Sequence, residues 1–318
     1  MRKMLTFGRY FKKKFGEKVR KIPISIPGFT CPNIDGTVAK GGCIFCRNES
    51  FSPILSKQAP APFKLHPGLS ENPHLEMQIE VLKKQFDSQV GFHREKFGMK
   101  KFLVYFQSFT NTYAPIETLK RLYSEAFRLP DVVGISIGTR IDSVNHEILD
   151  FLGEYAREKE VWIEYGIQSI HDRTLEGINR GHDSSEMEYW IKETQNRGIK
   201  VCVHLIYGLP GESEEMMLET LDKMIEWQAE SIKIHPLYVM AHTALATLYK
   251  KGEYTPITLE RYAWLIGESM KRIPKEIVVQ RVSAGAHTED LLAPDWCFDK
   301  NIQMRYIRDS LRATGIDY

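Results

Sequence analysis

Short apolar runs alternate with longer amphipathic stretches along most of the chain. The apolar runs are rich in β-branched and aromatic residues and predict six strands. These strands span residues 21–26, 101–106, 132–137, 161–166, 200–207 and 231–236. Helical periodicity between and after them predicts helices over residues 75–86, 116–128, 145–157, 185–197, 214–228 and 259–272. Regular alternation of strands and helices is typical of an α/β fold with a parallel sheet.

Six such units favour a partial (β/α)6 TIM-like barrel. The strand at 200–207 is almost continuously apolar, as expected when helices cover a sheet. We predict three segments: a basic N-terminal arm at 1–20, the barrel at 21–275, and a C-terminal extension at 276–318 that packs on the barrel. In such a barrel ligands gather at the carboxyl ends of the strands, so functional residues are expected directly after each strand.

The composition is that of a globular protein. The chain has 318 residues, of which 42% are hydrophobic and 26% charged, which is enough to bury a large core and excludes a disordered protein. No apolar run approaches the roughly 20 residues of a membrane-spanning helix, and no secretory apolar segment follows the basic start. We therefore predict a cytoplasmic protein without a membrane partner. Cysteines stay reduced in that compartment, so a close group of them indicates a metal or catalytic site before a disulfide.

The net charge of +2 hides an uneven distribution. Residues 1–21 contain nine basic residues and one acidic residue, a local charge of +8, while the rest of the chain is mildly acidic. Such an arm favours a partner with a phosphate backbone, because neutralised phosphates release counterions. The alternative is a solubilising helix with Phe7, Tyr10, Phe11 and Phe15 packed inward, and both can hold together. The basic residues are Arg2, Lys3, Arg9, Lys12, Lys13, Lys14, Lys18, Arg20 and Lys21.

Three of the five cysteines follow the first predicted strand in one glycine-rich loop. Cys31, Cys43 and Cys46 have the spacing C-x11-C-x2-C. Three thiolates can hold three irons of a four-iron four-sulfur cluster and leave the fourth iron open to a small molecule. A structural zinc ion is the alternative, but it needs a fourth ligand, and the nearest histidine, His66, lies far along a proline-rich loop. The other two cysteines are expected to be buried core thiols.

The cysteine loop resembles the hallmark of the radical S-adenosylmethionine (SAM) superfamily, in which the shorter spacing C-x3-C-x2-C is commonest. Three later segments resemble oxygen-independent coproporphyrinogen oxidase and its relatives; they are residues 163–169, 175–182 and 204–212. Residues 138–142 instead resemble a segment of the Elongator catalytic subunit. The closest resemblance is to the family of small bacterial radical SAM proteins known as YhcC and YtqA. It rests on residues 28–33, 35–36, 105–107 and 110–115.

The resemblance implies an enzyme that reductively cleaves SAM to a 5′-deoxyadenosyl radical, which then abstracts hydrogen from a substrate. A four-iron four-sulfur cluster, SAM and an external electron donor follow from it, with Cys31, Cys43 and Cys46 as the cluster ligands. Its motifs also imply SAM contacts. Arg180 would bind the methionine carboxylate and Gln168 the ribose.

Six further residues are implied near SAM. The backbone at Leu205, Ile206 and Tyr207 would flank the adenine. Thr110 and Asn111 stand where many relatives have a turn that meets the methionine amino group, although the glycines of that turn are absent here. The sixth residue, Arg140, is a candidate for substrate or cofactor contact.

The resemblance to Elongator implies tRNA modification, at carbon 5 of a wobble uridine, with a small-molecule co-substrate. Two alternatives stay open: a radical SAM enzyme that acts on a small metabolite or peptide, and a non-catalytic RNA-binding protein with a structural metal site. The oligomeric state does not follow from the sequence. Glu164 and His204, on predicted strands, are interpreted as core residues without a catalytic role.

Overall fold

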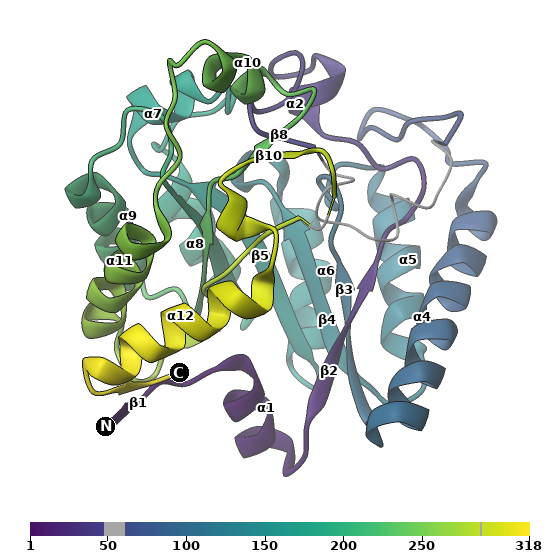
Figure 1. Cartoon of the computed structure of the whole chain (residues 1–318). Helices are drawn as coiled ribbons and strands as arrows, with labels where there is room; N and C mark the ends of the chain where they lie inside the picture. Colours follow the sequence, from purple (N-terminus) through teal and green to yellow (C-terminus); the bar gives the residue numbers. More distant parts are fainter. Residues whose placement is uncertain (48–60, 287) are drawn as a thin grey trace.

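Seven parallel strands form one curled sheet and follow each other in chain order (Figure 1). The computed structural model describes residues 1–47, 61–286 and 288–318. The strands are β2 (Val19–Ile24), β3 (Lys101–Phe106), β4 (Val132–Thr139), β5 (Glu160–Gln168), β6 (Lys200–Tyr207), β7 (Ser231–Pro236) and β9 (Val278–Arg281). The predicted partial barrel is confirmed, with one strand more than expected. The extra strand, β9, is only four residues long and lies in the segment assigned to the C-terminal extension.

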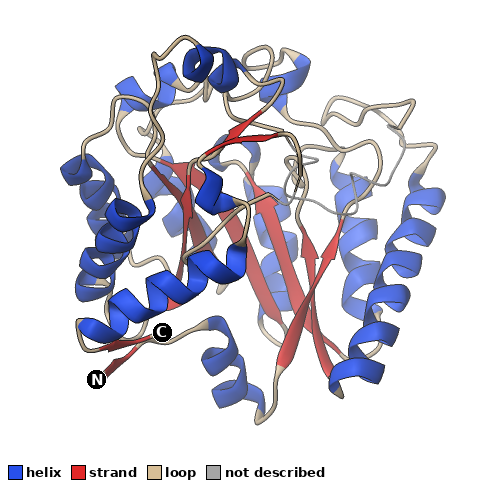
Figure 2. Cartoon of the chain, viewed as in Figure 1, coloured by secondary structure: helices blue, strands red, loops and turns tan. Residues whose placement is uncertain are grey.

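Helices cover the outer face of the sheet (Figure 2). They are α4 (Leu75–Phe97), α5 (Ile116–Arg128), α6 (His146–Ala156), α8 (Met187–Gln195), α9 (Glu214–Glu226) and α11 (Leu259–Arg272). Asn145, Ser213 and Thr258 cap α6, α9 and α11 by accepting a backbone N–H with the side chain. All six helices lie within two residues of their predicted bounds except α4. That helix continues until Gly98 ends it in a left-handed conformation.

Shorter elements complete the described part of the chain. β1 (Arg2–Lys3) pairs in parallel with β11 (Ile316–Asp317), and β8 (Val239–Met240) pairs antiparallel with β10 (Leu291–Ala293). The other helices are α1 (Phe7–Phe15), α2 (Pro32–Asp35), α7 (Asp172–Gly177), α10 (Ala244–Lys250) and α12 (Lys300–Ala313), with single 3-10 turns at Ile141–Ser143 and Asp295–Cys297. The pairing of β1 with β11 brings the two ends of the chain together.

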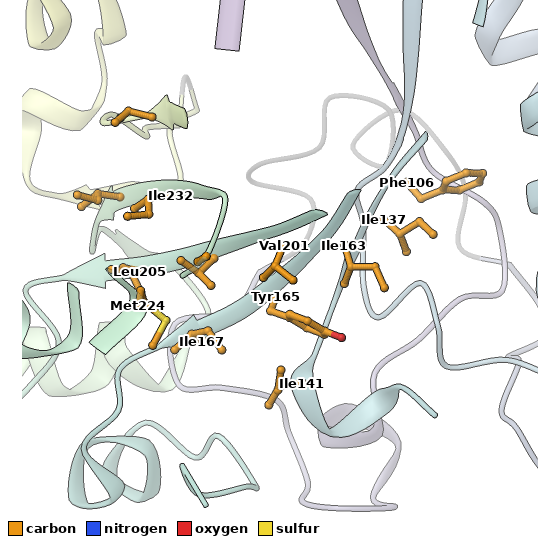
Figure 3. Close-up of a cluster of buried hydrophobic side chains, with 14 of the residues drawn as sticks. Phe106, Ile137, Ile141, Ile163, Tyr165, Ile167, Val201, Leu205, Met224 and Ile232 are labelled. Carbon is orange, nitrogen blue, oxygen red and sulfur yellow. The ribbon is translucent and has the colours of Figure 1, made fainter. Parts of the chain in front are cut away.

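The outer face of each strand supplies the hydrophobic core. Side chains such as Ile137, Ile163, Tyr165, Val201 and Leu205 are buried between the sheet and the helices (Figure 3). Because side chains alternate along a strand, the residues between them face the inside of the curl. Those inward residues are largely polar or very small, and they include Ser136, Gly138, Glu164, Gly166, Cys202 and His204.

Helix α1 closes the amino-terminal end of the barrel. Phe11 is completely buried and belongs to a separate apolar cluster with Leu103, Trp162, Cys202 and Val278. The other three aromatic residues of α1 pack against the same cluster. The interpretation of an amphipathic helix with its aromatic face inward is therefore confirmed.

Five of the nine basic residues near the N-terminus contact other parts of the barrel. Arg2 donates to the carbonyl of Lys271 (2.8 Å), and Arg9 forms an ion pair with Asp317 (2.8 Å). Arg20 donates to a histidine of α4, and two lysines form ion pairs with buried glutamates, namely Lys14 with Glu160 and Lys21 with Glu164. Among the described residues, no ion-pair partner is found for Lys3, Lys12, Lys13 and Lys18.

Candidate active site

The cysteine loop leaves the carboxyl end of β2 and lies at the upper end of the barrel in Figure 1, beside α2. Cys31 stands immediately before α2, whose first residue is Pro32. Cys43 and Cys46 bracket a turn in which the Cys46 N–H donates to the Cys43 carbonyl (2.9 Å). Cys43 is buried, Cys31 and Cys46 are partly exposed, and none of the three forms a disulfide. The loop therefore offers three free thiols at the end of the barrel where ligands bind.

A turn after α7 holds this loop in place. The Asn179 amide donates to the carbonyls of Lys40 (3.0 Å) and Gly42 (2.8 Å). Asn33 donates to the Asn179 carbonyl (2.6 Å) and to the Cys43 sulfur (3.5 Å). Next in the turn, Gly181 has a φ of 78°, and a Cβ there would lie 2.9 Å from the Asn33 side-chain oxygen. The turn and the loop therefore form one unit.

Two buried arginines lie beside the loop but differ in their partners. Arg180 is 6% exposed, donates to the Gly166 carbonyl, and has a terminal nitrogen 3.6 Å from the Cys43 sulfur. No carboxylate among the described residues forms an ion pair with it. Arg140 instead forms a bidentate pair with Asp142 (2.8 and 2.6 Å) and donates to the Arg180 carbonyl (2.8 Å). Arg180 is therefore the arginine whose charge is open to a carboxylate from a ligand.

The pair formed by Arg140 and Asp142 is ionised at neutral pH. Burial acts to raise the pKa of Asp142, but the hydrogen bonds and charge of Arg140 outweigh it, so the pKa is lowered. Burial, together with the charge of Arg180, lowers the pKa of His182 to about 4. His182 is therefore neutral at pH 7 and can offer a hydrogen bond without adding charge.

The loop after β3 brings Thr110 and Asn111 next to the cysteine loop. The Thr110 N–H donates to the carbonyl of Thr30, the residue before Cys31 (3.1 Å). The Asn111 amide donates to the Gly138 carbonyl at the end of β4 (2.8 Å), and its buried side-chain oxygen has no hydrogen-bond partner in the part of the chain that the structure describes. The predicted location of both residues near the cluster is consistent with these contacts.

Gln168 stands at an irregular position at the end of β5. Its φ is 71°, and the register between β5 and β6 shifts between Gly166 and Gln168. A Cβ at Gly166 would lie 2.8 Å from the Gln168 amide nitrogen and 3.2 Å from a terminal nitrogen of Arg180. The absence of a side chain at Gly166 thus leaves room for both residues.

The three residues expected beside adenine point in different directions. Leu205 belongs to the outer core, and the Tyr207 hydroxyl forms a hydrogen bond with Ser269 of α11 (2.8 Å). Both side chains are therefore turned away from the site. Ile206 is partly exposed and alternates with them, so only its side chain faces inward. A role for the backbone of these residues stays a prediction.

Unpartnered polar atoms gather at this end of the barrel. Among the described residues, ten buried side-chain N or O atoms lack a hydrogen-bond partner, and six of them lie here. They belong to Asn33, Asn111, Arg140, Gln168, Arg180 and His182. Buried polar groups in proteins are nearly always satisfied, so such a concentration indicates a ligand that supplies the missing donors and acceptors. SAM fits this set because it carries a carboxylate, an amino group and a ribose.

Comparison with known proteins agrees with this geometry. Residues 35–224 match the Radical SAM superfamily, and residues 229–313 match the Radical_SAM C-terminal domain. The chain belongs to the radical SAM superfamily. It is therefore a radical SAM enzyme, and membership implies a four-iron four-sulfur cluster and SAM as cofactors.

Full-length relatives cover most of this radical SAM enzyme. Protein YhcC of Escherichia coli K12 is 36% identical over 292 residues, which are 92% of this chain and 86% of that protein. MJ0486 of Methanocaldococcus jannaschii is 38% identical over 311 residues, 97% and 89% of the two chains. YtqA of Bacillus subtilis is 33% identical over 295 residues, 93% and 85% of the two chains. The resemblance to the YhcC and YtqA family is thus confirmed.

Solved structures confirm the fold at low sequence identity. The Elp3 protein of Methanocaldococcus infernus superposes with a TM-score of 0.59 at 16% identity, over 94% of this chain and 65% of that one. The coproporphyrinogen III oxidase HemN of Escherichia coli has a TM-score of 0.51 at 15% identity, over 83% and 54% of the two chains.

Among the described residues, the three thiol sulfurs of the cysteine loop do not all lie within 4.8 Å of one another. Sulfurs bound to one zinc ion at 2.3 Å lie roughly 3.8 Å apart. Within the described residues, the sole triad of candidate ligand atoms within 4.8 Å of one another is Glu164, Cys202 and His204, not the loop cysteines. In that triad Glu164 already forms ion pairs with Lys21 and Lys233, and the two positive charges disfavour a metal cation there.

Several residues of the site had been named only as parts of motifs or had not been singled out. Asn33 and Asn179 join the loop to the turn, and both lie in segments that carry the resemblance. They are 146 residues apart in the sequence, so no local pattern predicts their contact. Asp142 lies in the segment at residues 138–142 and was not singled out, yet its carboxylate accepts both hydrogen bonds that anchor Arg140. Among the described residues, every helix is too short or too polar to span a lipid bilayer.

Proposed function

We propose that this radical SAM enzyme holds its cluster on Cys31, Cys43 and Cys46 and binds SAM at the carboxyl ends of β3, β4 and β5. The concentration of unpartnered buried polar atoms at these strand ends carries the proposal. When bound, the cluster supplies the electron that cleaves SAM, and hydrogen abstraction from a substrate follows.

The residues of the chain orient the cofactor by complementary chemistry. Arg180 binds the methionine carboxylate, because its guanidinium is buried and forms no ion pair with an acidic side chain of the described residues. The Asn111 side-chain oxygen accepts a hydrogen bond from the amino group, and the Gln168 oxygen accepts one from a ribose hydroxyl. Arg140 acts as a positioning residue, since it holds the Arg180 backbone while its own charge is paired with Asp142.

Metal analysis tests the cluster ligands directly. After anaerobic reconstitution the parent should hold about four irons and four sulfides, and Cys31→Ala, Cys43→Ala and Cys46→Ala should each lose most of them. Cys297→Ala is the matched control, because Cys297 is also a buried free thiol but lies in a 3-10 turn far from the loop in sequence. Full iron content in any loop variant would remove that cysteine from the ligand set, and zinc without sulfide in the parent would overturn the proposal.

We further infer that the substrate is a tRNA nucleoside, modified at carbon 5 of a wobble uridine with a small-molecule co-substrate and an external electron donor. The support is a likeness to the tRNA uridine(34) acetyltransferase of Methanocaldococcus jannaschii, 31% identical over 144 residues, 41% of this chain and 26% of that protein. The modified nucleosides of tRNA from cells with and without the gene test this inference. Identical nucleoside profiles would favour the metabolite or peptide alternative.

The basic N-terminal helix is poorly placed to hold phosphates next to the target nucleoside. Helix α1 precedes β2 and lies at the amino ends of the strands, while the cysteine loop lies at their carboxyl ends (Figure 1). Five of the nine basic residues are also engaged within the barrel. The tRNA proposal therefore rests on the relatives and the site, and not on the charge of residues 1–20.

A further inference from the structure

The interior of the barrel holds a charged cluster below the proposed SAM site. Glu164 of β5 is 1% exposed and forms ion pairs with Lys21 of β2 and Lys233 of β7. Ser136 and His204 also contact its carboxylate, His204 at 2.8 Å. Because β2, β5 and β7 are not neighbours in the sheet, these side chains meet across the inside of the curl.

A third cation extends the cluster. Arg281, at the end of β9, pairs in register with Lys233, and its charge acts on Lys233, His204 and His235. No carboxylate among the described residues forms an ion pair with Arg281. Three cations thus share one carboxylate, which leaves a surplus of positive charge inside the barrel. Lys233 is buried, whereas Lys21 and Arg281 are partly exposed. Positive charge held largely away from water without enough counter-charge is unfavourable, so an anion from outside the chain would complete the cluster.

Neutral donors surround the same place. The side chains of His235 and Gln280 each have a buried nitrogen for which residues 1–47, 61–286 and 288–318 supply no hydrogen-bond partner. Burial lowers the pKa of His204 to about 4 and that of His235 well below its ordinary value. Both rings are therefore neutral at pH 7. Burial also lowers the pKa of Lys233 to about 8, although Glu164 acts to raise it, which is a further sign that negative charge is short here.

The depth of the cluster suits a substrate and not the cofactor. Glu164 stands two residues before Gly166, whose carbonyl accepts from Arg180, and two residues of strand span about 7 Å. Below the cluster, Phe11, Leu103 and Trp162 fill the amino end of the barrel. A group that reaches the buried Lys233 therefore enters from the carboxyl end, past the SAM site.

We propose that the barrel interior binds an anionic group of the substrate, a carboxylate or a phosphate, through Lys233, Arg281 and Lys21. This inference rests on the proposed function, because it places the anion within reach of SAM. The ammonium groups of the lysines have donors left after Glu164 is satisfied, and the guanidinium of Arg281 offers a fork that matches either anion. The anion anchors one end of the substrate while its reacting carbon lies nearer the cofactor.

Anion-dependent thermal stability of the reconstituted, SAM-bound protein tests the site. Sodium acetate and inorganic phosphate serve as probes at constant ionic strength, and a saturable rise in Tm gives an apparent Kd. Arg281→Met and Lys233→Met should each weaken binding by about tenfold or more, as expected for a lost hydrogen bond to a charged group. Lys200→Met is the matched control, because Lys200 pairs with the other buried glutamate, Glu160, at the amino end of the barrel.

The outcomes separate this inference from the proposed function. Saturation by acetate alone indicates a substrate carboxylate, and saturation by phosphate alone indicates a phosphate. No saturable effect of either probe, or equal Kd values in the parent and both interior variants, overturns the anion site. Arg281 is partly exposed and forms no ion pair with any of the described residues, so Arg281→Met should fold and should keep the iron content and SAM affinity of the parent. Failure of the parent itself to hold iron or SAM would instead overturn the proposed function.

Discussion

Removal of the negative charge of Glu164 should strongly destabilise the enzyme. In Glu164→Gln the ammonium groups of Lys21 and Lys233 keep their place but lose their counter-charge. The two lysine side chains are only 18% and 5% exposed, so neither can turn freely into water. Breaking a buried ion pair from one side costs about 3 to 5 kcal/mol of unfolding free energy.

The expected change in Tm follows from the size of the chain. At about 2.1 cal/mol/K per residue, the unfolding entropy of 318 residues makes 1 kcal/mol equivalent to about 1.5 °C. Glu164→Gln should therefore lower the Tm by about 4 to 8 °C, which anaerobic calorimetry can measure. The matched control is Glu160→Gln. Its carboxylate is equally buried, but its partners Lys14 and Lys200 are 47% and 27% exposed and can remain hydrated, so a smaller loss of about 1 to 2 kcal/mol is expected.

The loss in Glu164→Gln should also depend on pH. Burial lowers the pKa of Lys233 to about 8 in the folded parent, below its ordinary value of 10.5, and loss of the attraction to Glu164 must lower it further. At pH values between the pKa of Lys233 in the folded variant and its pKa in the folded parent, the folded variant has lost the Lys233 proton while the unfolded chain still binds it. In that range the free energy of unfolding therefore rises with pH in the variant but not in the parent. The difference in Tm should therefore be larger at pH 6 than at pH 8.5.

The charged and titratable groups that face Lys233 support this direction of the pH dependence. They are Glu164, Lys21, Tyr105, Cys202, His204, His235 and Arg281. Both histidines are neutral across this range, and the pKa values of Tyr105 and Cys202 are raised, so none of these four gains or loses a proton between pH 6 and 8.5. A loss below about 1 kcal/mol, or the same loss at both pH values, would refute the interpretation of a buried, charge-deficient cluster.

Three further predictions concern the site and the two ends of the barrel. Arg180→Ala should keep the visible spectrum of the cluster but weaken SAM binding by about 1.5 to 3 kcal/mol in anaerobic equilibrium dialysis; unchanged affinity would place Arg180 outside the site. Phe11→Ala should lower the free energy of unfolding by about 3 to 5 kcal/mol in urea titrations, since it empties a fully buried position, and a loss near zero would contradict the packing of α1. Replacing Lys12 and Lys13 by Gln should leave the log–log salt slope of tRNA binding unchanged within 1 unit, whereas a fall of about 1.4 to 1.8 units would show that the RNA reaches α1.

The fold could be predicted from local patterns wherever an element is long and periodic. The strands at 101–106, 200–207 and 231–236 match their predicted bounds. The first two are mostly apolar runs, and the third alternates polar residues with Ile232 and Ile234 and ends at Pro236. β9 escaped prediction because four residues are too few to show a period. The pattern of aromatic residues predicts the N-terminal helix but not its place under the barrel. That place depends on contacts with both β2 and β9, and these two strands lie far from each other in the sequence.

The site was predictable only where its chemistry is local in sequence. The cysteine spacing and the motifs around Gln168 and Arg180 lie in short segments. The interior cluster does not, since Glu164 and His204 look like isolated polar residues on buried strands. Their significance depends on which face of each strand the curl encloses, and on Lys21 arriving from β2 to meet them. Sequence periodicity gives the alternation of faces but not the closure that brings the inner faces together.

The composition of the interior layers argues that the charged layer serves binding more than stability. One layer below, inward positions carry Leu103 and Trp162, which pack with Phe11 as an ordinary apolar core. Replacement of a buried ion pair by apolar residues of similar size is often neutral or stabilising. Packing alone would therefore favour apolar side chains at positions 164 and 233 in place of Glu164 and Lys233. The chain instead places three cations around one carboxylate at the depth where a substrate would lie. An anion that arrives with the substrate would relieve this imbalance, so that substrate binding and stabilisation of the barrel would be coupled.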